Sequence, residues 1–235
     1  MESNIGEYYK MSISVKETAD IQGVNVNNDL VEVRGYQNFN IGRNSIQFID
    51  QDTHSWVDTR LKTELVEKIL TEKKCRSYVD FGSNLGVLVF KSAMMGVDSL
   101  GVDYNLDYVK VCSAIVDHLQ IENIKFANHT FDFFEDSKPW DLVSLNNIHH
   151  HLFGRTEQPM SLKYINELVL SKCKWFVTQF PTELDPKAIK WTNYYPGSGT
   201  YSRKEFLEGL GDREFHCMYE SSKRPIFLIK GDIPE

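Results

Sequence analysis

The chain has 235 residues, of which 41% are hydrophobic and 25% are charged. This length suits one large domain or one domain with a small cap, and the composition is that of an ordinary globular protein. Acidic residues outnumber basic ones by 33 to 26, which gives a net charge of −7. That charge disfavours long-range attraction to nucleic acid or to an anionic membrane, because both require a basic face.

The four cysteines are dispersed along the chain, at positions 75, 112, 173 and 217. Metal and redox sites need clustered sulfur, so we expect free thiols in a reducing compartment. The first residues, MESNIGEYYKMSIS, contain no apolar core of a signal sequence, and no apolar run approaches the length of a membrane span. We therefore expect a cytoplasmic protein without a membrane partner.

The first 50 residues are polar and rich in Asn and Gln, with short strand-like pieces such as LVEVRGYQ. They are too weakly patterned for an independent domain, and we expect an N-terminal arm or cap over residues 1–55. In residues 56–70 the apolar side chains of Leu61, Leu65, Ile69 and Leu70 form a helical stripe. The main domain is expected to cover residues 56–235.

Strands and helices alternate from residue 76 onward. The expected strands are RSYVDFG, SLGVDY, IKFANHTF, WDLVSLNNI and KWFVTQF, and the expected helices are LGVLVFKSAMMG, NLDYVKVCSAIVDHLQ, MSLKYINELVLSK and the short RKEFLEGLG. Two further strands, FHCMYES and RPIFLIKG, close the chain as a hairpin. The pattern predicts an α/β fold, a doubly wound and mostly parallel seven-stranded sheet with a C-terminal antiparallel hairpin.

A loop with two glycines follows the first of these strands, in the sequence VDFGSNLG. A strand, a glycine loop and a helix bring backbone N–H groups and the positive end of a helix against a ligand. Asp103 lies 21 residues beyond Gly82, at the tip of the next strand. A carboxylate there can accept hydrogen bonds from two ribose hydroxyls, which suits both a nicotinamide dinucleotide and S-adenosylmethionine.

Three details favour S-adenosylmethionine. The spacing is Gly82-x-x-x-Gly86, with Asn84 in the middle, and not the G-x-G-x-x-G of a dinucleotide site. Asp80 stands before the loop, where a carboxylate would repel a pyrophosphate but would suit an ammonium group. Asp132 and Phe133 follow the third strand, where an acid and a ring suit the amino group and the face of adenine.

Together, VDFGSNLG, GVDYN, FDFF and WDLVSLNNIHHH resemble the ordered motifs of class I S-adenosylmethionine-dependent methyltransferases, over residues 56–235. The resemblance implies that Asp80 and the loop from Gly82 to Gly86 hold the methionine end of the cofactor. It implies Asp103 for the ribose and Asn146 for the floor under the sulfonium. The residues that the resemblance implies for the cofactor site are Asp80, Gly82, Ser83, Asn84, Gly86, Asp103, Tyr104, Asp132, Phe133 and Asn146.

Three consecutive histidines, at positions 149–151, suggest a metal site, but their spacing argues against one. Neighbouring side chains in a helix point about 100° apart, and in a strand only the first and third share a face. We expect no metal. His149 and His150 are instead the candidates for a general base that acts on the methyl acceptor, and a structural role for all three stays open.

The expected reaction is direct methyl transfer from S-adenosylmethionine to a small-molecule hydroxyl, with nitrogen acceptors less favoured. The segment YYPGSGTYSRKEF, residues 194–206, is either a surface connection or a lid over the acceptor. Two alternatives remain. The pattern NxxHH distantly resembles the ExxEHH-like site of enzymes that methylate RNA 3′ ends, and a silent scaffold subunit could bind the cofactor without turnover. A homodimer also stays open.

Overall fold

The structure is a computed structural model that describes residues 24–27, 30–33, 38–49, 54–154, 160–186 and 202–234. The chain divides into two compact units, Met1–Thr130 and Phe131–Glu235, and each is described by itself. Within the described residues, no helix is both long enough and apolar enough to cross a membrane.

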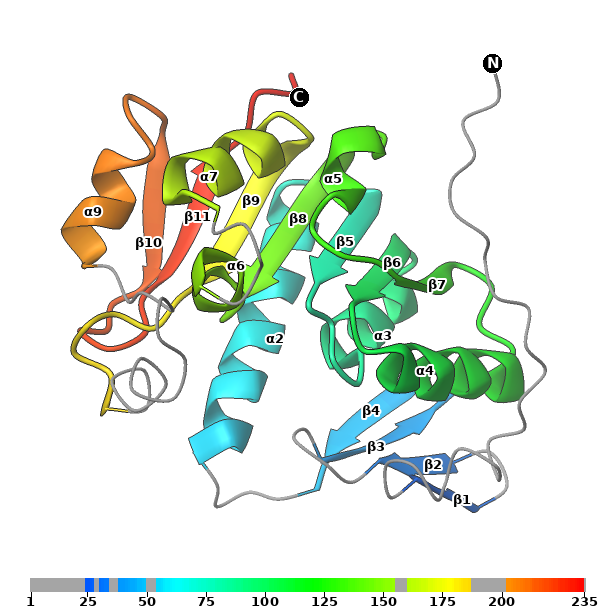
Figure 1. The fold of residues 1–235 in the computed structure, drawn as a ribbon. Helices are drawn as coiled ribbons and strands as arrows, with labels where there is room; N and C mark the ends of the chain where they lie inside the picture. The colour runs from blue at the N-terminus through cyan, green and yellow to red at the C-terminus, as the bar shows by residue number, and fades with distance from the viewer. Residues whose placement is uncertain are drawn as a thin grey trace. The chain divides into compact units, whose positions relative to one another are not determined.

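A seven-stranded sheet carries the fold, in the strand order β10-β11-β9-β8-β5-β6-β7 (Figure 1). Its strands are β5 (Ser77–Phe81), β6 (Asp98–Asp103), β7 (Ile124–Asn128), β8 (Trp140–Asn146), β9 (Cys173–Gln179), β10 (Phe215–Tyr219) and β11 (Ile226–Lys230). The pairs β5–β6, β6–β7 and β8–β9 are parallel, whereas β11 runs antiparallel to both β9 and β10. The mostly parallel sheet with its C-terminal hairpin is the predicted fold class, and it is confirmed.

Helices connect these strands. They are α2 (His54–Glu72), α3 (Val87–Met94), α4 (Leu106–Leu119), α5 (Phe133–Asp136), α6 (His149–Gly154), α7 (Leu162–Leu170) and α9 (Arg203–Glu208). Local signals set several of their starts, because the side chains of Asn105 and Ser161 accept backbone N–H bonds at the beginning of α4 and α7. Ser202 and Glu205 form a capping box at α9.

The N-terminal segment forms its own four-stranded antiparallel sheet. Its strands are β1 (Val24–Asn27), β2 (Leu30–Val33), β3 (Phe39–Gly42) and β4 (Ser45–Phe48), paired in chain order. Val31, Val33, Phe39 and Ile41 are fully buried. Within this unit β4 contacts α3, and Arg43 donates to Gln120 at the end of α4 (3.1 Å). In its described residues, the expected arm is therefore a sheet that contacts α3 and the end of α4.

The buried face of α2 differs from the predicted apolar stripe. Leu61 and Leu65 are half-buried, whereas Ile69 and Leu70 are buried as expected. Toward the N-terminus the buried positions continue one step around the helix, at Thr59, Lys62, Thr63 and Val66. The buried stripe thus changes from apolar to polar along the helix, which a count of apolar residues alone could not show.

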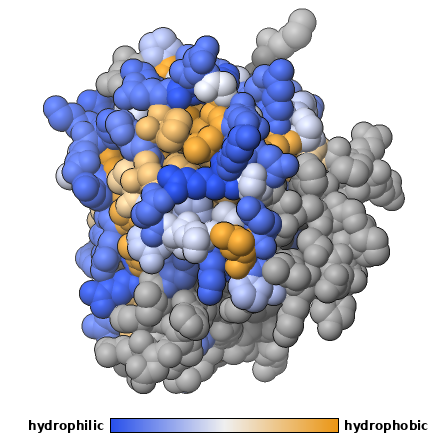
Figure 2. Space-filling model, turned by 90° about the vertical axis from the view of Figure 1, so that its left-hand side faces the viewer, coloured by the Kyte–Doolittle hydropathy of each residue, from blue (hydrophilic) through white to orange (hydrophobic). Residues whose placement is uncertain are grey.

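The edge strand β10 lies on the face drawn in Figure 2, where apolar side chains form a patch among hydrophilic ones. Phe215 and Tyr219 of this strand are exposed. An edge strand offers unpaired backbone groups to a partner chain. The homodimer left open by the sequence stays a prediction.

Two glycines in the first unit leave room for one aromatic ring. A Cβ on Gly101, in β6, would lie 2.4 Å from the ring of Phe126, and a Cβ on Gly86 would lie 2.5 Å from the same ring. Gly86 also has φ +73°, in the left-handed region. Phe126 is buried in β7, so the ring locks the loop before α3 against the sheet.

We predict that Gly101→Ala destabilises the fold by about 1–3 kcal/mol, because the new methyl group overlaps a buried ring. Phe126→Leu in that background should recover part of the loss. Gly96 has φ +81°, and no described residue lies within 4 Å of the place that a Cβ would take, so Gly96→Ala isolates backbone strain, worth about 1 kcal/mol. Urea unfolding of the four proteins tests this; an unaltered midpoint in Gly101→Ala would contradict the packing.

Candidate functional site

The loop between β5 and α3 has three residues in the left-handed conformation. Gly82 has φ 76°, Asn84 has φ 51° and Gly86 has φ 73°. Asparagine adopts this conformation more readily than other residues with a side chain. Asn84 therefore takes a backbone conformation that usually requires glycine.

Every backbone N–H from position 82 to position 86 donates within the chain. The N–H groups of Gly82 and Ser83 donate to the carbonyl of Val102 (2.7 and 3.1 Å), and that of Asn84 donates to Oδ2 of Asp103 (2.8 Å). The N–H of Leu85 donates to Oδ1 of Asn84, and that of Gly86 to the carbonyl of Ser83 (both 2.8 Å). The expectation of loop N–H groups directed at a ligand is wrong for these five residues, because the sheet, Asp103 and the loop itself already hold them.

Asp103 joins the loop to the end of β6. One oxygen accepts from Asn84 as above, and the other accepts from the N–H of Asn105 (2.9 Å). The side chain is 5% exposed, and burial raises the pKa of Asp103 while the N–H groups of Asn105 and Asn84 act to lower it. An ionised carboxylate has about four lone-pair sites. Two remain for hydroxyl groups of a ligand.

Two residues that the sequence did not single out support this arrangement. The side chain of Asn128, which pairs in register with Asp103 from β7, donates to the carbonyls of Asp103 and Tyr104 (2.9 and 2.8 Å). The thiol of Cys112 donates to the carbonyl of Asn84 (3.7 Å), and burial together with the Asp103 charge raises the pKa of this thiol. Asn128 could have been found from its place at the end of the neighbouring strand.

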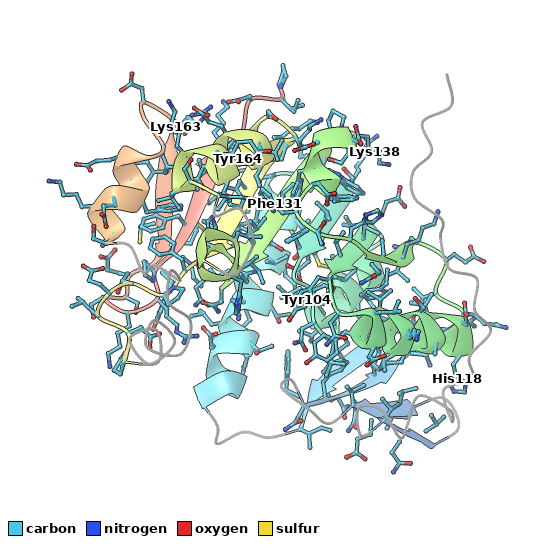
Figure 3. The ribbon with its side chains drawn as sticks, in the orientation of Figure 1. Tyr104, His118, Phe131, Lys138, Lys163 and Tyr164 are labelled. Carbon is cyan, nitrogen blue, oxygen red and sulfur yellow. The ribbon has the colours of Figure 1, made fainter. Side chains whose placement is uncertain are left out.

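The remaining predicted residues of the first unit occupy different surroundings. Asp80 lies inside β5, one residue before its end, and is 4% exposed. The hydroxyl of Ser83 is buried, 3.0 Å from the point where a Cβ of Gly101 would be, and so faces the sheet. Tyr104 follows Asp103 and is 75% exposed (Figure 3). The structure therefore brings Asp103 and the loop together, and Tyr104 is exposed next to Asp103.

Asp132 and Phe133 belong to the second unit, where they begin α5. Asp132 is exposed at the N-cap position and makes no side-chain capping bond. Phe133 is half-buried and lies edge-on to the buried ring of Phe134, with ring centroids 5.4 Å apart. Their assignment to adenine stays a prediction.

The carboxyl end of β8 is fixed to β9 by side chains. The backbone N–H of Asn147 donates to the carbonyl of Gln179 (2.6 Å), and its side-chain amide donates to the amide oxygen of Gln179 (2.7 Å). Nδ2 of Asn146 and Oδ1 of Asn147 are buried atoms without a hydrogen-bond partner among the described residues. This edge therefore offers one donor and one acceptor, and it includes the asparagine predicted for the sulfonium floor.

His149 is the first residue of α6 and is completely buried. Its ring lies among Phe176, Phe180 and Phe206, with Nδ1 3.4 Å from the hydroxyl of Thr178. Burial lowers the pKa of His149 from 6.5 to about 4, although the neighbouring side chain of Asn166 acts in the opposite direction. The imidazole is thus a neutral member of the interior, and its action as a general base stays a prediction.

Other predicted features of this unit fall partly outside the described residues. The side chain of His150 lies outside them, as do residues 194–201 of the predicted lid. In the part that is described, Asp185 after β9 pairs with Arg224 before β11, and the hydroxyl of Thr182 donates to the carbonyl of Ser222 (2.6 Å). No group of three His, Cys, Asp or Glu side chains suited to a metal ion occurs among the described residues.

The comparisons with solved structures report on the fold. The structure of WbdD matches with a TM-score of 0.60 and 15% identity, over 74% of this chain and 40% of that one. WbdD is described as a bifunctional kinase-methyltransferase. The fold is that of the class I S-adenosylmethionine-dependent methyltransferases.

Two further structures of this fold agree. The N-terminal domain of EvdMO1, with SAH bound, matches with a TM-score of 0.55 and 10% identity, over 72% of this chain and 80% of that one. An O-methyltransferase family protein from Burkholderia thailandensis matches with a TM-score of 0.57 and 8% identity, over 75% and 57%. The chain spans about two fifths of the WbdD chain. No protein-family model and no curated protein sequence matches it.

We predict that His149 makes stability depend on pH. A depressed pKa in the folded state favours folding above about pH 6.5, and that contribution is lost as the pH falls to about 4, where the loss reaches about 3 kcal/mol. His149→Leu should lower stability overall, since the hydroxyl of Thr178 loses its contact with the ring, but it should flatten the difference between pH 7 and pH 4.

Urea unfolding at the two pH values measures this difference. His118, which is exposed on α4 (Figure 3), provides the matched control His118→Leu, which should keep the parental difference. If His149→Leu kept the parental difference in stability between pH 7 and pH 4, the buried imidazole would not be the cause of that difference.

Proposed function

We propose that this protein is an S-adenosylmethionine-dependent methyltransferase that methylates a hydroxyl group of a small molecule. The observation that carries the proposal is the state of the loop between β5 and α3. Its five N–H groups from position 82 to position 86 are engaged, and Asp103 keeps acceptor capacity.

This arrangement favours one of two ribose-containing ligands, S-adenosylmethionine, over the other, a nicotinamide dinucleotide. A pyrophosphate needs backbone donors and is repelled by carboxylates, and the loop supplies neither free N–H groups at positions 82–86 nor a neutral surrounding. S-adenosylmethionine needs an acceptor for its ribose hydroxyls and carries a positive sulfonium and an ammonium group. The buried carboxylates Asp80 and Asp103 therefore suit it better than a dinucleotide.

The solved neighbours support the cofactor and the reaction class. One of them contains SAH, the product that S-adenosylmethionine becomes on losing its methyl group, and another is named an O-methyltransferase family protein. The net charge of −7 supports a small acceptor over a polynucleotide.

The reaction would be an in-line displacement. The acceptor oxygen attacks the methyl carbon, the carbon–sulfur bond breaks, the electron pair stays on sulfur, and the hydroxyl proton passes to a base or to water. The protein's part is to align the reactants and to exclude water, which is worth several orders of magnitude in rate. The cytoplasmic location belongs to the same proposal.

We predict that Asp103→Ala weakens binding of S-adenosylmethionine at least tenfold, at about 1.5–3 kcal/mol for each charge-assisted hydrogen bond. Isothermal titration calorimetry measures the affinity. Asp98, exposed at the other end of the same strand, provides the control Asp98→Ala, which should bind as the parent does.

Two results would contradict the proposal. Asp103→Ala could bind with unchanged affinity while remaining folded, or the parent could show no affinity for the cofactor. If the protein bound S-adenosylmethionine tightly but consumed none with any acceptor, the alternative of a silent scaffold subunit would be favoured. If it methylated RNA alone, the alternative of an RNA methyltransferase would be favoured.

A further inference from the structure

Helix α2 carries a buried cation that the proposed site has not used. Lys62 is 7% exposed, and its ammonium lies 3.0 Å from Oδ2 of Asp58, one turn earlier. An ammonium has three donors. Among the described residues, Asp58 is the ion-pair partner of the Lys62 ammonium. A buried ammonium with unused donors is costly unless a further acceptor reaches it.

Two independent comparisons of position along neighbouring elements place Lys62 level with the glycine loop. Helix α2 returns into β5 through a short turn, in which the N–H of Cys75 donates to the carbonyl of Leu70. From Leu70 back to Lys62 is about 12 Å of helix, and from Ser77 forward to Phe81 is about 13 Å of strand. Lys62 therefore lies at the height at which β5 ends and the loop begins.

The packing of α2 against α3 gives the same height. Lys91 of α3 pairs with Glu67 of α2 (3.1 Å), and the two helices contact each other. Lys91 is one turn after Val87, the first residue of α3. One turn before Glu67 is Thr63, so Lys62 again lies beside the loop at Gly86. Side chains in a helix lean toward its N-terminus, which carries the ammonium beyond the edge of the sheet.

The buried stripe of α2 changes character at this height. Val66, Ile69 and Leu70 are apolar, whereas Thr59, Lys62 and Thr63 continue the same buried face as polar residues. A buried face that becomes polar where the sheet ends is expected where it meets a bound ligand and not a core.

We propose that Lys62 binds the carboxylate of the methionine end of the cofactor, with Asp58 holding the ammonium in place before the ligand arrives. The assignment rests on the proposed function, because S-adenosylmethionine is the ligand that brings this carboxylate to the loop. Two carboxyl side chains, Asp80 and Asp103, are already buried at this end of the sheet, so a ligand carboxylate at the loop is bound better with a cation at the same height.

The test compares two ligands that differ by the amino-acid end. SAH carries the carboxylate, whereas 5′-methylthioadenosine keeps the adenosine and the thioether and lacks it. Lys62→Met should weaken SAH binding by about 10- to 100-fold in calorimetry and leave 5′-methylthioadenosine binding unchanged. Lys68 forms the same i,i+4 pair with Glu72 on the exposed side of α2, and Lys68→Met should change neither affinity.

Asp58→Asn provides a second variant that keeps the lysine. It removes the charge but keeps a side-chain oxygen that can still hold the ammonium, so it should keep the affinity for SAH, again without effect on 5′-methylthioadenosine. A loss equal to that of Lys62→Met would overturn the assignment.

Failure of the Lys62 assignment can be distinguished from failure of the proposed function. If Lys62→Met binds SAH as the parent does, or loses both ligands equally, the lysine has a structural role and the assignment fails while the cofactor proposal stands. If the parent binds neither ligand, the proposed function fails, and the assignment of Lys62 fails with it.

Discussion

One carboxylate determines the shape of the candidate site. Asp103 accepts an N–H from the loop after β5 and an N–H from the residue that begins α4, so a single side chain holds two connections that are far apart in the sequence. Burial disfavours its charged form, which raises the pKa of Asp103, and the two N–H bonds oppose that cost. Without it, the N–H of Asn84 would be left without a partner in a part-buried loop.

The rest of the loop follows from this constraint. Asn84 must turn its N–H toward Asp103, which places it in the left-handed region at φ 51°, and its own side chain then accepts from Leu85. Gly86 completes the turn where a side chain would overlap Phe126. The site is therefore a set of carboxylate acceptors on a rigid frame, and its chemistry is that of binding hydroxyls and cations.

Much of this could be predicted from the sequence, since strand and helix periods, the two glycines and the acids at the strand ends are local signals. The mostly parallel seven-stranded sheet and the hairpin followed from them. The pairing of the four-residue strands between Val24 and Phe48 into one sheet could not, because strands this short are defined by their partners and not by their own pattern. The surroundings of His149 depend on three phenylalanines from distant segments, which no local spacing reports. Lys62 was missed because the predicted buried stripe of α2 was drawn from apolar residues alone, whereas Lys62 lies on the buried face.

We propose that the loop and Asp103 bind an adenosyl sulfonium and not a dinucleotide. A pair of calorimetric titrations of the unmodified protein, one with SAH and one with NAD, distinguishes the two ligands. We expect saturable binding of SAH with one site per chain and no measurable binding of NAD. Saturable binding of NAD with no heat from SAH would contradict it.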